Sequence, residues 1–201
     1  MTANHPENMA SVGQLPSVAT WTFGDSREVS EGLRSFPISV DGKWLTVQIL
    51  AAQAPFELSS LNEGSSRKTM VLRLPKGWDE PFGMLEAALV KEAAANSQAL
   101  FGERLSEEQL IERYKSITQK TGDFPRNVRA KVNLGAGPYA TRYWDMARAA
   151  VTAPGLYAGK SYNAVLTIRS LWTSNDAWGV VCDCTDLQIL ESTPVDCPFH
   201  P

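Results

Sequence analysis

The chain has 201 residues, of which 43% are hydrophobic and 20% charged, the composition of a globular protein with one domain of ordinary size. No window approaches the roughly 18 uninterrupted apolar residues that a membrane span needs. The N-terminus lacks a basic region followed by an apolar run, so we expect no secretory signal, a cytoplasmic location and no membrane partner. Its 3 cysteines, two of them in a Cys-Xaa-Cys step, make no disulfide framework, and we expect reduced thiols.

The net charge of −3 conceals an uneven distribution along the chain. Between Arg126 and Trp172 the sequence has seven basic residues and one acid, Asp145, so the rest of the chain carries the acidic excess. A basic segment inside an acidic protein is typical of proteins that bind anionic ligands. The basic residues of this segment are Arg126, Arg129, Lys131, Arg142, Arg148, Lys160 and Arg169.

The N-terminal third predicts a disordered segment followed by strands. Residues 1–20 are rich in polar residues, glycine and proline and have no periodicity, which is typical of disorder. The first expected element is a β-hairpin of strands 36–40 and 43–50, joined by the tight-turn pair Asp41-Gly42. A linker over residues 53–66 then leads to a basic strand over residues 67–74, which Pro75 closes.

The middle of the chain predicts a helical hairpin, inserted between strands over residues 79–122. The run 82–100 is rich in alanine, with apolar residues at helical spacing, and Gly102 interrupts it. Ser106 and Gln109 have the spacing of a capping box, and one apolar stripe continues from there until Gly122 ends the second helix. Since the outer faces of both helices are polar, we expect the insertion to serve as scaffold.

Strand pattern resumes over residues 126–134, where polar and apolar residues alternate regularly. The apolar set consists of Val128, Ala130, Val132 and Leu134. If these residues point into the protein, Arg129 and Lys131 form a basic row on the outer face. A strand over residues 139–145 and a helical turn over residues 146–153 are expected to follow.

The last predicted element is a β-hairpin over residues 156–190, with turn residues from Thr173 to Asp176. In its first strand, Tyr162 and Trp172 share the parity of the apolar Leu166, so we assign both rings to the core. The second strand is apolar enough to be buried partly on both faces. This hairpin is therefore expected to close the fold.

The order of these elements predicts a mainly β protein with an OB-fold-like five-stranded barrel and a helical hairpin between strands. We expect this domain to span residues 21–191, with the disordered segment before it and a C-terminal tail over residues 192–201.

The chain resembles the single-stranded-DNA-binding proteins of tailed bacteriophages in the order of its elements, with KTMVLRLP running into a long helix and then FPRNVRAKVNL. The resemblance covers residues 36–191 as architecture and residues 156–190 as sequence, in YAGKSYNAVLTIRSLW and WGVVCDCTDLQIL. It implies an OB-fold that coats and protects single-stranded DNA during phage replication and recombination in the host cytoplasm. Members of this family commonly end in an acidic tail that contacts replication proteins, whereas this chain ends in STPVDCPFHP. A replication partner and a homodimer are therefore left open.

Binding a single strand with little sequence preference requires cations that meet phosphates and exposed rings on which bases stack. The segment from Arg126 to Trp178 offers both, and Tyr139 also lies in it. Lys43 and Trp44, just after the first turn, add to the set. The predicted nucleic-acid-binding residues are Arg126, Arg129, Lys131, Arg142, Tyr143, Trp144, Tyr157, Lys160, Arg169, Trp178, Lys43 and Trp44.

Other functions find less support in the residues. Cys182, Cys184, Cys197 and His200 have the composition of a closed zinc site, but cysteine is commonly buried as a small apolar residue, so we predict no metal and no cofactor. The histidines, His5 and His200, both lie in terminal segments, where no scaffold positions a base, and we predict a protein that is not an enzyme. A structural or protein-interaction β-barrel is the alternative. The preference between RNA and DNA, the site size and the oligomeric state are left open.

Overall fold

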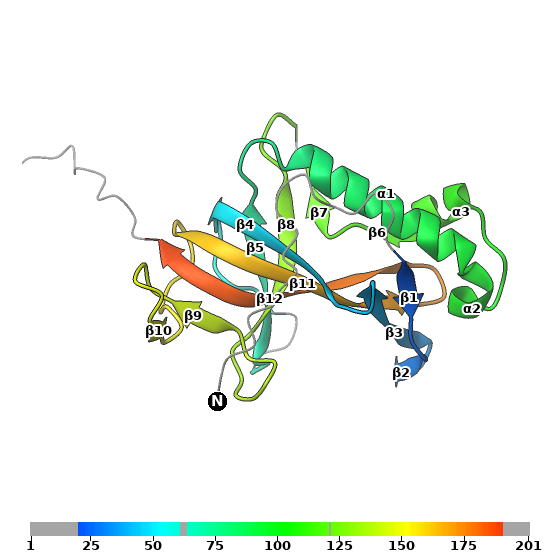
Figure 1. Ribbon diagram of the computed structural model, residues 1–201, viewed down its shortest axis with the longest axis horizontal. Helices are drawn as coiled ribbons and strands as arrows, with labels where there is room; N and C mark the ends of the chain where they lie inside the picture. Colours follow the sequence, from blue (N-terminus) through cyan, green and yellow to red (C-terminus); the bar gives the residue numbers. More distant parts are fainter. Residues whose placement is uncertain (1–19, 61–63, 121, 191–201) are drawn as a thin grey trace, which may run out of the picture.

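Strands are the main secondary structure of the described part of the chain, which comprises residues 20–60, 64–120 and 122–190 of a computed structural model (Figure 1). The prediction of a mainly β fold with a helical insertion is confirmed. The expected segment before residue 20 and the tail after residue 190 lie outside the described residues. None of the helices in the described ranges combines the length and the apolar character needed to cross a membrane.

The elements follow one another along the chain with one block of helices between strands. They are β1 (Trp21–Phe23), β2 (Arg27–Ser30), β3 (Leu33–Val40), β4 (Leu45–Gln53), β5 (Arg67–Arg73), α1 (Asp79–Ala95), α2 (Ser97–Phe101), α3 (Glu107–Arg113), β6 (Tyr114–Lys115), β7 (Thr118–Gln119), β8 (Asn127–Asn133), β9 (Arg142–Trp144), β10 (Ala150–Val151), β11 (Ser161–Thr173) and β12 (Trp178–Leu190).

Five of the strands form a closed ring in the order β4-β5-β8-β12-β11, because β11 pairs with β12 on one side and with β4 on the other. All neighbours in the ring are antiparallel except β8 and β12, which run parallel. Counted along the chain, the ring strands lie in the order 1-2-3-5-4, which is the strand order of an OB-fold. The fold predicted from the sequence is therefore confirmed.

The predicted hairpin around Asp41-Gly42 forms only its turn. Val40 and Lys43 bridge, and both turn residues have positive φ, 51° at Asp41 and 74° at Gly42, as a type I′ turn requires. Beyond the turn the two strands separate, because each pairs with a different half of the long β11. Pairing of β3 and β4 with β11 therefore replaces the ladder of the predicted hairpin.

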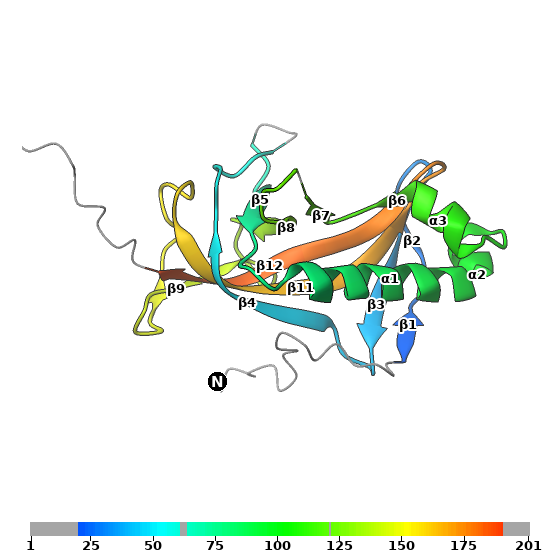
Figure 2. The ribbon, with the colours of Figure 1, turned by 90° about the horizontal axis from the view of Figure 1, so that it is seen from above.

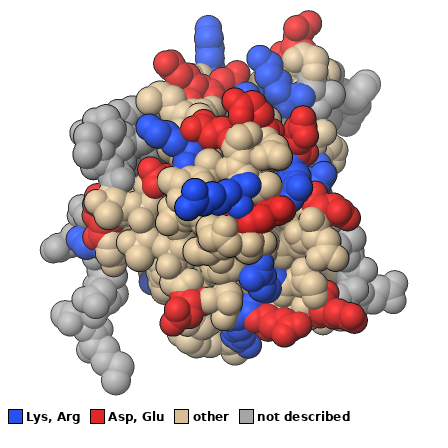
Figure 3. Space-filling model, turned by 90° about the vertical axis from the view of Figure 1, so that its right-hand side faces the viewer, with Lys and Arg blue, Asp and Glu red and all other residues tan. Residues whose placement is uncertain are grey.

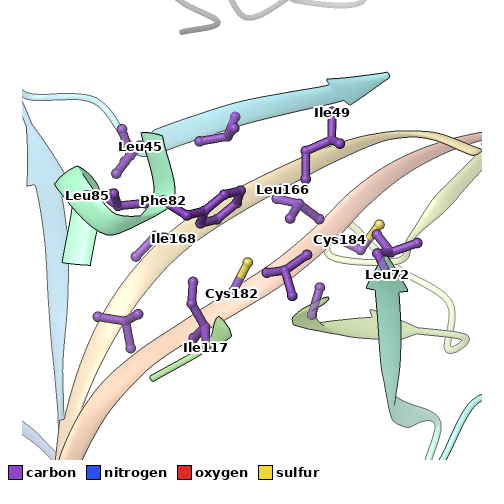
Figure 4. Close-up of a cluster of buried hydrophobic side chains, with 14 of the residues drawn as sticks. Leu45, Ile49, Leu72, Phe82, Leu85, Ile117, Leu166, Ile168, Cys182 and Cys184 are labelled. Carbon is purple, nitrogen blue, oxygen red and sulfur yellow. The ribbon is translucent and has the colours of Figure 1, made fainter. Parts of the chain in front are cut away.

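The helices lie along one side of β11 and β12 (Figures 1 and 2). Phe82 and Leu85 of α1 are buried beside Leu45 of β4 and Ile168 of β11 (Figure 4). The predicted capping box is confirmed, since Ser106 Oγ accepts from the Gln109 amide at 3.3 Å and Gln109 Oε1 accepts from the Ser106 amide at 2.9 Å. The insertion therefore covers the core, as expected of a scaffold.

The second predicted helix is wrong in its length, since α3 ends at Arg113. The next residues instead pair with the edges of the ring, β6 with β12 and β7 with β8. Ile117 is buried between these two short strands. The carboxylate of Glu86 on α1 holds the segment by accepting hydrogen bonds from the hydroxyl groups of Tyr114, Ser116 and Thr118. These tertiary contacts end the helix before Gly122.

Four smaller predictions concern single residues or short segments. Tyr162 is fully buried, which confirms its assignment to the core. Trp172 is only half-buried, because the bulge at Arg169 changes the parity of the strand and turns Leu171 inward instead. Leu134 is exposed because β8 ends one residue before it. The helical turn predicted over residues 146–153 is absent, since Ala150 and Val151 form β10 and pair with β9.

Replacing Phe82 with Ala should lower the free energy of unfolding by about 3–5 kcal/mol, because it leaves a cavity where α1 packs on the ring. Met84, which lies on the exposed side of the same helix, provides the matched control, and Met84→Ala should change stability by less than about 0.5 kcal/mol. Urea unfolding followed by circular dichroism measures both. Equal effects of the two substitutions would contradict the packing of α1 described above.

Candidate nucleic-acid interface

Cationic side chains line the outer face of β5 and β8. The two strands pair antiparallel, and their inward residues, Met70 and Leu72 on β5 among them, are buried in the ring. The alternate residues therefore point outward, in the cross-strand pairs Arg67 with Asn133, Thr69 with Lys131, Val71 with Arg129 and Arg73 with Asn127. We call this outer surface, together with Arg169, the cationic face; its cations are Arg67, Arg73, Arg129, Lys131 and Arg169.

Two of the predicted binding residues, Arg129 and Lys131, lie at the centre of the cationic face. Arg129 donates to Gln119 Oε1 at 2.5 Å, and Lys131 Nζ donates to Thr69 Oγ1 at 2.8 Å. Partial burial, followed by the nearby charge of Arg67, lowers the pKa of Lys131. An anion arriving at this face would offset the repulsion from Arg67 and so favour the charged form of the ammonium group.

Arg169 reaches this face because of a β-bulge. On β12, Cys182 and Val181 pair with Ile168 and Ser170, so Arg169 has no partner of its own. At the same point the other neighbour of β11 changes from β4 to β3. A bulge bends the strand and redirects the side chain of the extra residue. The local irregularity therefore places the Arg169 guanidinium outside the ring, beside the start of β4.

The Arg169 guanidinium lies between two aromatic rings. Its central carbon is 4.6 Å from the ring centroid of Trp44 and 5.1 Å from that of Tyr139. Both distances are within the range of a cation–π interaction. The two rings keep much of their surface in solvent, with Trp44 52% and Tyr139 63% exposed. The arrangement thus offers a fixed positive charge flanked by two open aromatic surfaces.

Tyr139 is held in place by the loop between β8 and β9. Asn133 Nδ2 donates to the Tyr139 carbonyl at 3.1 Å, and Asn133 Oδ1 accepts from the Gly135 amide at 3.0 Å. The hydroxyl of Thr141 fixes the end of the loop by donating to the Cys184 carbonyl at 2.7 Å. An aromatic side chain on a loop tied in this way loses little conformational entropy when a ligand stacks on it.

Asp183 of β12 lies beneath the cations. Its carboxylate accepts from Arg67 at 2.5 Å, and its second oxygen is 3.9 Å from Arg169 Nε. Lys131 is its Cα partner across the parallel pairing of β8 and β12. One acid therefore serves several cations, and the cationic face keeps a net positive charge.

A second, smaller cluster lies farther along β12, where β9 extends the sheet beyond the ring (Figure 1). Asp186 accepts from Arg142 at 2.8 Å and from Trp144 Nε1 at 2.9 Å. The Arg142 guanidinium carbon lies 5.9 Å from the Trp144 ring centroid. The two carboxylates are three residues apart, about 10 Å along a strand, so both clusters lie on one continuous surface.

Arg126 is engaged in attaching the helical insertion, since it is paired with Asp79 of α1 at 3.3 Å and donates to Thr118 Oγ1 at 2.9 Å. Lys160 is half-buried just before β11, and Lys43 is exposed in the turn between β3 and β4, next to Trp44 in the chain. For Lys160 and Lys43 a role in binding stays a prediction.

Three predicted rings are buried, which corrects their place in the interface. Trp178 has no exposed surface and donates from Nε1 to the Leu110 carbonyl at 2.8 Å. Tyr143 and Tyr157 bond to each other through their hydroxyl groups at 2.8 Å, and burial raises the pKa of both. A base cannot stack on these rings in the folded protein, because other side chains already cover them.

The cysteines of the zinc alternative lie in the core. Cys182 and Cys184 point inward from β12 and are buried beside apolar residues (Figure 4). Cys197 and His200 lie outside the described residues. Within the described residues no group of three or more His, Cys, Asp or Glu side chains is arranged to hold a metal.

Sequence reasoning missed Arg67, Tyr139 and Asp183 as site residues. Arg67 had a signal, since it shares the parity of Thr69 and Val71 in a strand recognised as basic. Tyr139 also had a signal, since it lies in the segment recognised as aromatic and basic. Asp183 had none, because its position depends on a parallel pairing between segments distant in the chain.

The end of the molecule that carries the helical insertion has a different surface. Figure 3 shows Lys and Arg side chains intermixed with Asp and Glu side chains on that end. A mixture of charges of both signs gives no single-sign field to attract a polyanion. The clusters on the outer face of the strands are therefore the better candidates for an anion-binding surface.

Comparison with known proteins gives structural likeness only. The chain matches no protein-family model and no curated protein. Among solved structures it is similar to the single-stranded DNA-binding protein from bacteriophage Enc34 in complex with ssDNA, with 9% identity, a TM-score of 0.45 and coverage of 89% of this chain and 98% of that one. The C-terminal truncation of the Enc34 protein is 11% identical, with a TM-score of 0.47 and coverage of 87% of this chain and 97% of that one. A third structure of the Enc34 protein is 9% identical, with a TM-score of 0.45 and coverage of 85% of this chain and 90% of that one. These proteins belong to the class that the closing hairpin resembles. At such identities and TM-scores, these likenesses do not identify the ligand of this chain.

Cys182 and Cys184 should not react with thiol reagents in the folded protein. Burial raises the pKa of Cys182 to about 12 and raises that of Cys184 well above its ordinary value, so neither side chain is a thiolate at pH 8. In a Cys197→Ser variant, which retains only these two thiols, labelling with Ellman's reagent should require denaturant. Rapid labelling of two thiols without denaturant would contradict their position in the core.

Proposed function

We propose that this protein binds single-stranded DNA on the cationic face, with phosphate contacts, base stacking and little sequence preference. The observation that carries the proposal is the Arg169 guanidinium held between Trp44 and Tyr139, in a surface that also contains Arg67 and Lys131. The outer face of the second and third strands of an OB-fold is a surface that binds oligonucleotides in this fold class. In this chain those strands are β5 and β8.

The cations fit the backbone of a nucleic acid. Arg67, Arg129 and Lys131 lie on two neighbouring strands, and their spacing follows the sheet. Guanidinium and ammonium groups in such a row neutralise successive phosphates and release condensed counterions, which favours binding at low salt. Arginine also binds a phosphate through two parallel hydrogen bonds.

The rings fit unpaired bases. Trp44 and Tyr139 present open aromatic surface, and stacking of a base on such a ring contributes about 1–3 kcal/mol. Bases in a duplex are already stacked on one another, so their faces are available only in a single strand. Every base has a π face, and stacking of this kind discriminates little between sequences.

The resemblance of the closing hairpin to phage single-stranded-DNA-binding proteins supports a proposal for the biological role. The protein coats and protects single strands during phage-type replication and recombination in the host cytoplasm, and it does no chemistry on them. Any contact with replication proteins or with a second copy of the chain is an additional property that this role permits.

The proposal is tested by titrating the protein with oligo(dT) and following tryptophan fluorescence. We expect quenching at low salt, and an affinity that falls steeply as salt rises. Duplex DNA added as competitor should displace the oligonucleotide poorly. A protein that does not bind oligo(dT) at low salt would remove the nucleic-acid proposal and leave the protein-interaction alternative.

Trp44 should be a main reporter in this titration, since it is exposed on the cationic face whereas Trp178 is buried. A Trp44→Phe variant keeps an aromatic surface for stacking but lacks the indole. It should therefore bind oligo(dT) with similar affinity and show reduced quenching.

Replacing both Arg129 and Lys131 with Ala should weaken binding and flatten its salt dependence. Loss of two phosphate contacts should reduce the slope of log K against log salt by about 1.4, because each contact on a single strand contributes about 0.7. The measurement is the oligo(dT) affinity at four or more salt concentrations.

The matched control replaces two exposed cations of the helical insertion, Lys91 and Arg104, with Ala. It removes the same net charge at a distance from the cationic face and should leave the slope nearly unchanged. If the control flattens the slope as much as the test variant does, the strand binds elsewhere.

A further inference from the structure

The two outward carboxylates of β12 share one pattern of contacts. Asp183 accepts from Arg67, and Asp186 accepts from Arg142. In both pairs the arginine lies above and the acid beneath, since the side chains of Arg67 and Arg142 are 50% and 56% exposed while those of Asp183 and Asp186 are 20% and 15% exposed. An anion that approaches from solvent therefore meets the arginines first.

These carboxylates resemble the phosphates that the proposed function requires. A carboxylate and a phosphate both offer two oxygens to a guanidinium, and arginine binds either through two parallel hydrogen bonds. An arginine that already bonds a carboxylate must give up that contact, wholly or in part, to bond a phosphate in the same way. The acid and the nucleic acid therefore compete for one partner.

Two of the cations near these acids also have aromatic contacts. Arg169 is held by the rings of Trp44 and Tyr139, and its nearest Asp183 oxygen, 3.9 Å from Nε, is beyond hydrogen-bonding distance. Within the described residues the buried Arg169 Nε has no hydrogen-bond partner at all. Arg142 is likewise supported by the ring of Trp144, at 5.9 Å. An asparagine at either position keeps one acceptor oxygen, so the hydrogen bonds that Arg67 donates to residue 183 and Trp144 donates to residue 186 can persist when the carboxylate charge is removed.

We propose that Asp183 and Asp186 are internal competitors of the bound strand. In the free protein each holds an arginine, and on binding Arg67 and Arg142 exchange their carboxylates for phosphates of the single strand. The exchange lowers the affinity of the face and makes release of the strand faster. This inference rests on the proposed function, because it names the residues that regulate the same surface.

The test is oligo(dT) binding by Asp183→Asn and Asp186→Asn variants, each at about 0.1 M salt, where interactions between exposed charges fade beyond about 10 Å. Asparagine keeps the shape and one acceptor oxygen but removes the charge. We expect each variant to bind about two- to fivefold more tightly than the unmodified protein, the range that corresponds to one exposed ion pair. The two variants probe separate pairs, so either one alone suffices if the other does not fold.

The matched control is Asp25→Asn, which changes the net charge equally at an exposed position in the loop between β1 and β2. Its affinity should stay within about 1.5-fold of the unmodified protein, because at this salt only charges close to the strand act on it. An equal gain in the control would show a general effect of net charge and would overturn the inference.

A double-mutant cycle separates competition from simple repulsion. In an Arg142→Ala background there is no arginine for Asp186 to hold, so Asp186→Asn should no longer tighten binding. A gain that persists undiminished in that background would overturn the exchange mechanism.

The outcomes distinguish this inference from the proposed function. If the unmodified protein binds oligo(dT) and both Asn variants bind equally or more weakly, the inference fails and the function stands. If neither the unmodified protein nor the variants bind at low salt, the proposed function fails, and the inference fails with it.

Discussion

The antiparallel ladder between β11 and β12 is the contact on which both the core and the candidate interface depend. It joins twelve residue pairs, from Ser161 with Leu190 to Thr173 with Trp178, and it closes the ring of five strands. β11 also extends past the ring to carry β3, and β12 extends past it to carry β9. Because the same two strands bound the buried interior and support the outer clusters, a loss of their pairing would disorder both.

Two irregularities in this ladder determine which side chains reach the outer surface. One leaves Arg169 without a partner, and the other leaves Thr185 unpaired between Cys184 and Asp186. In a regular strand Asp183 and Asp186, three residues apart, would point to opposite faces. The extra residue at Thr185 restores the parity, so both carboxylates lie outside while Cys184 and Leu187 are buried.

These irregularities also mark how far the sequence could predict the site. Alternation over residues 126–134 was sufficient to place Arg129 and Lys131 on an outer face, because β8 is regular from Asn127 to Asn133. The fold class could be predicted as well, because the strands and helices are recognisable in the sequence in the order that the fold requires. Trp178 and Tyr157 were misplaced, because the burial of a ring depends on what packs over it, here Tyr114 for Trp178 and Tyr143 for Tyr157. A local pattern contains no information on such distant partners.

The separation of charge along the chain becomes a separation in space through the fold. Several of the acids occupy the first turns of helices, Asp79 and Glu80 in α1 and Glu107 and Glu108 in α3, where the helix dipole favours negative charge. The alternation of β5 and β8 sends cations to one surface, on the strands rather than on the insertion. A chain with a net charge of −3 can therefore present a cationic face. For this reason the local surface, and not the total charge, governs which polyanion the protein attracts.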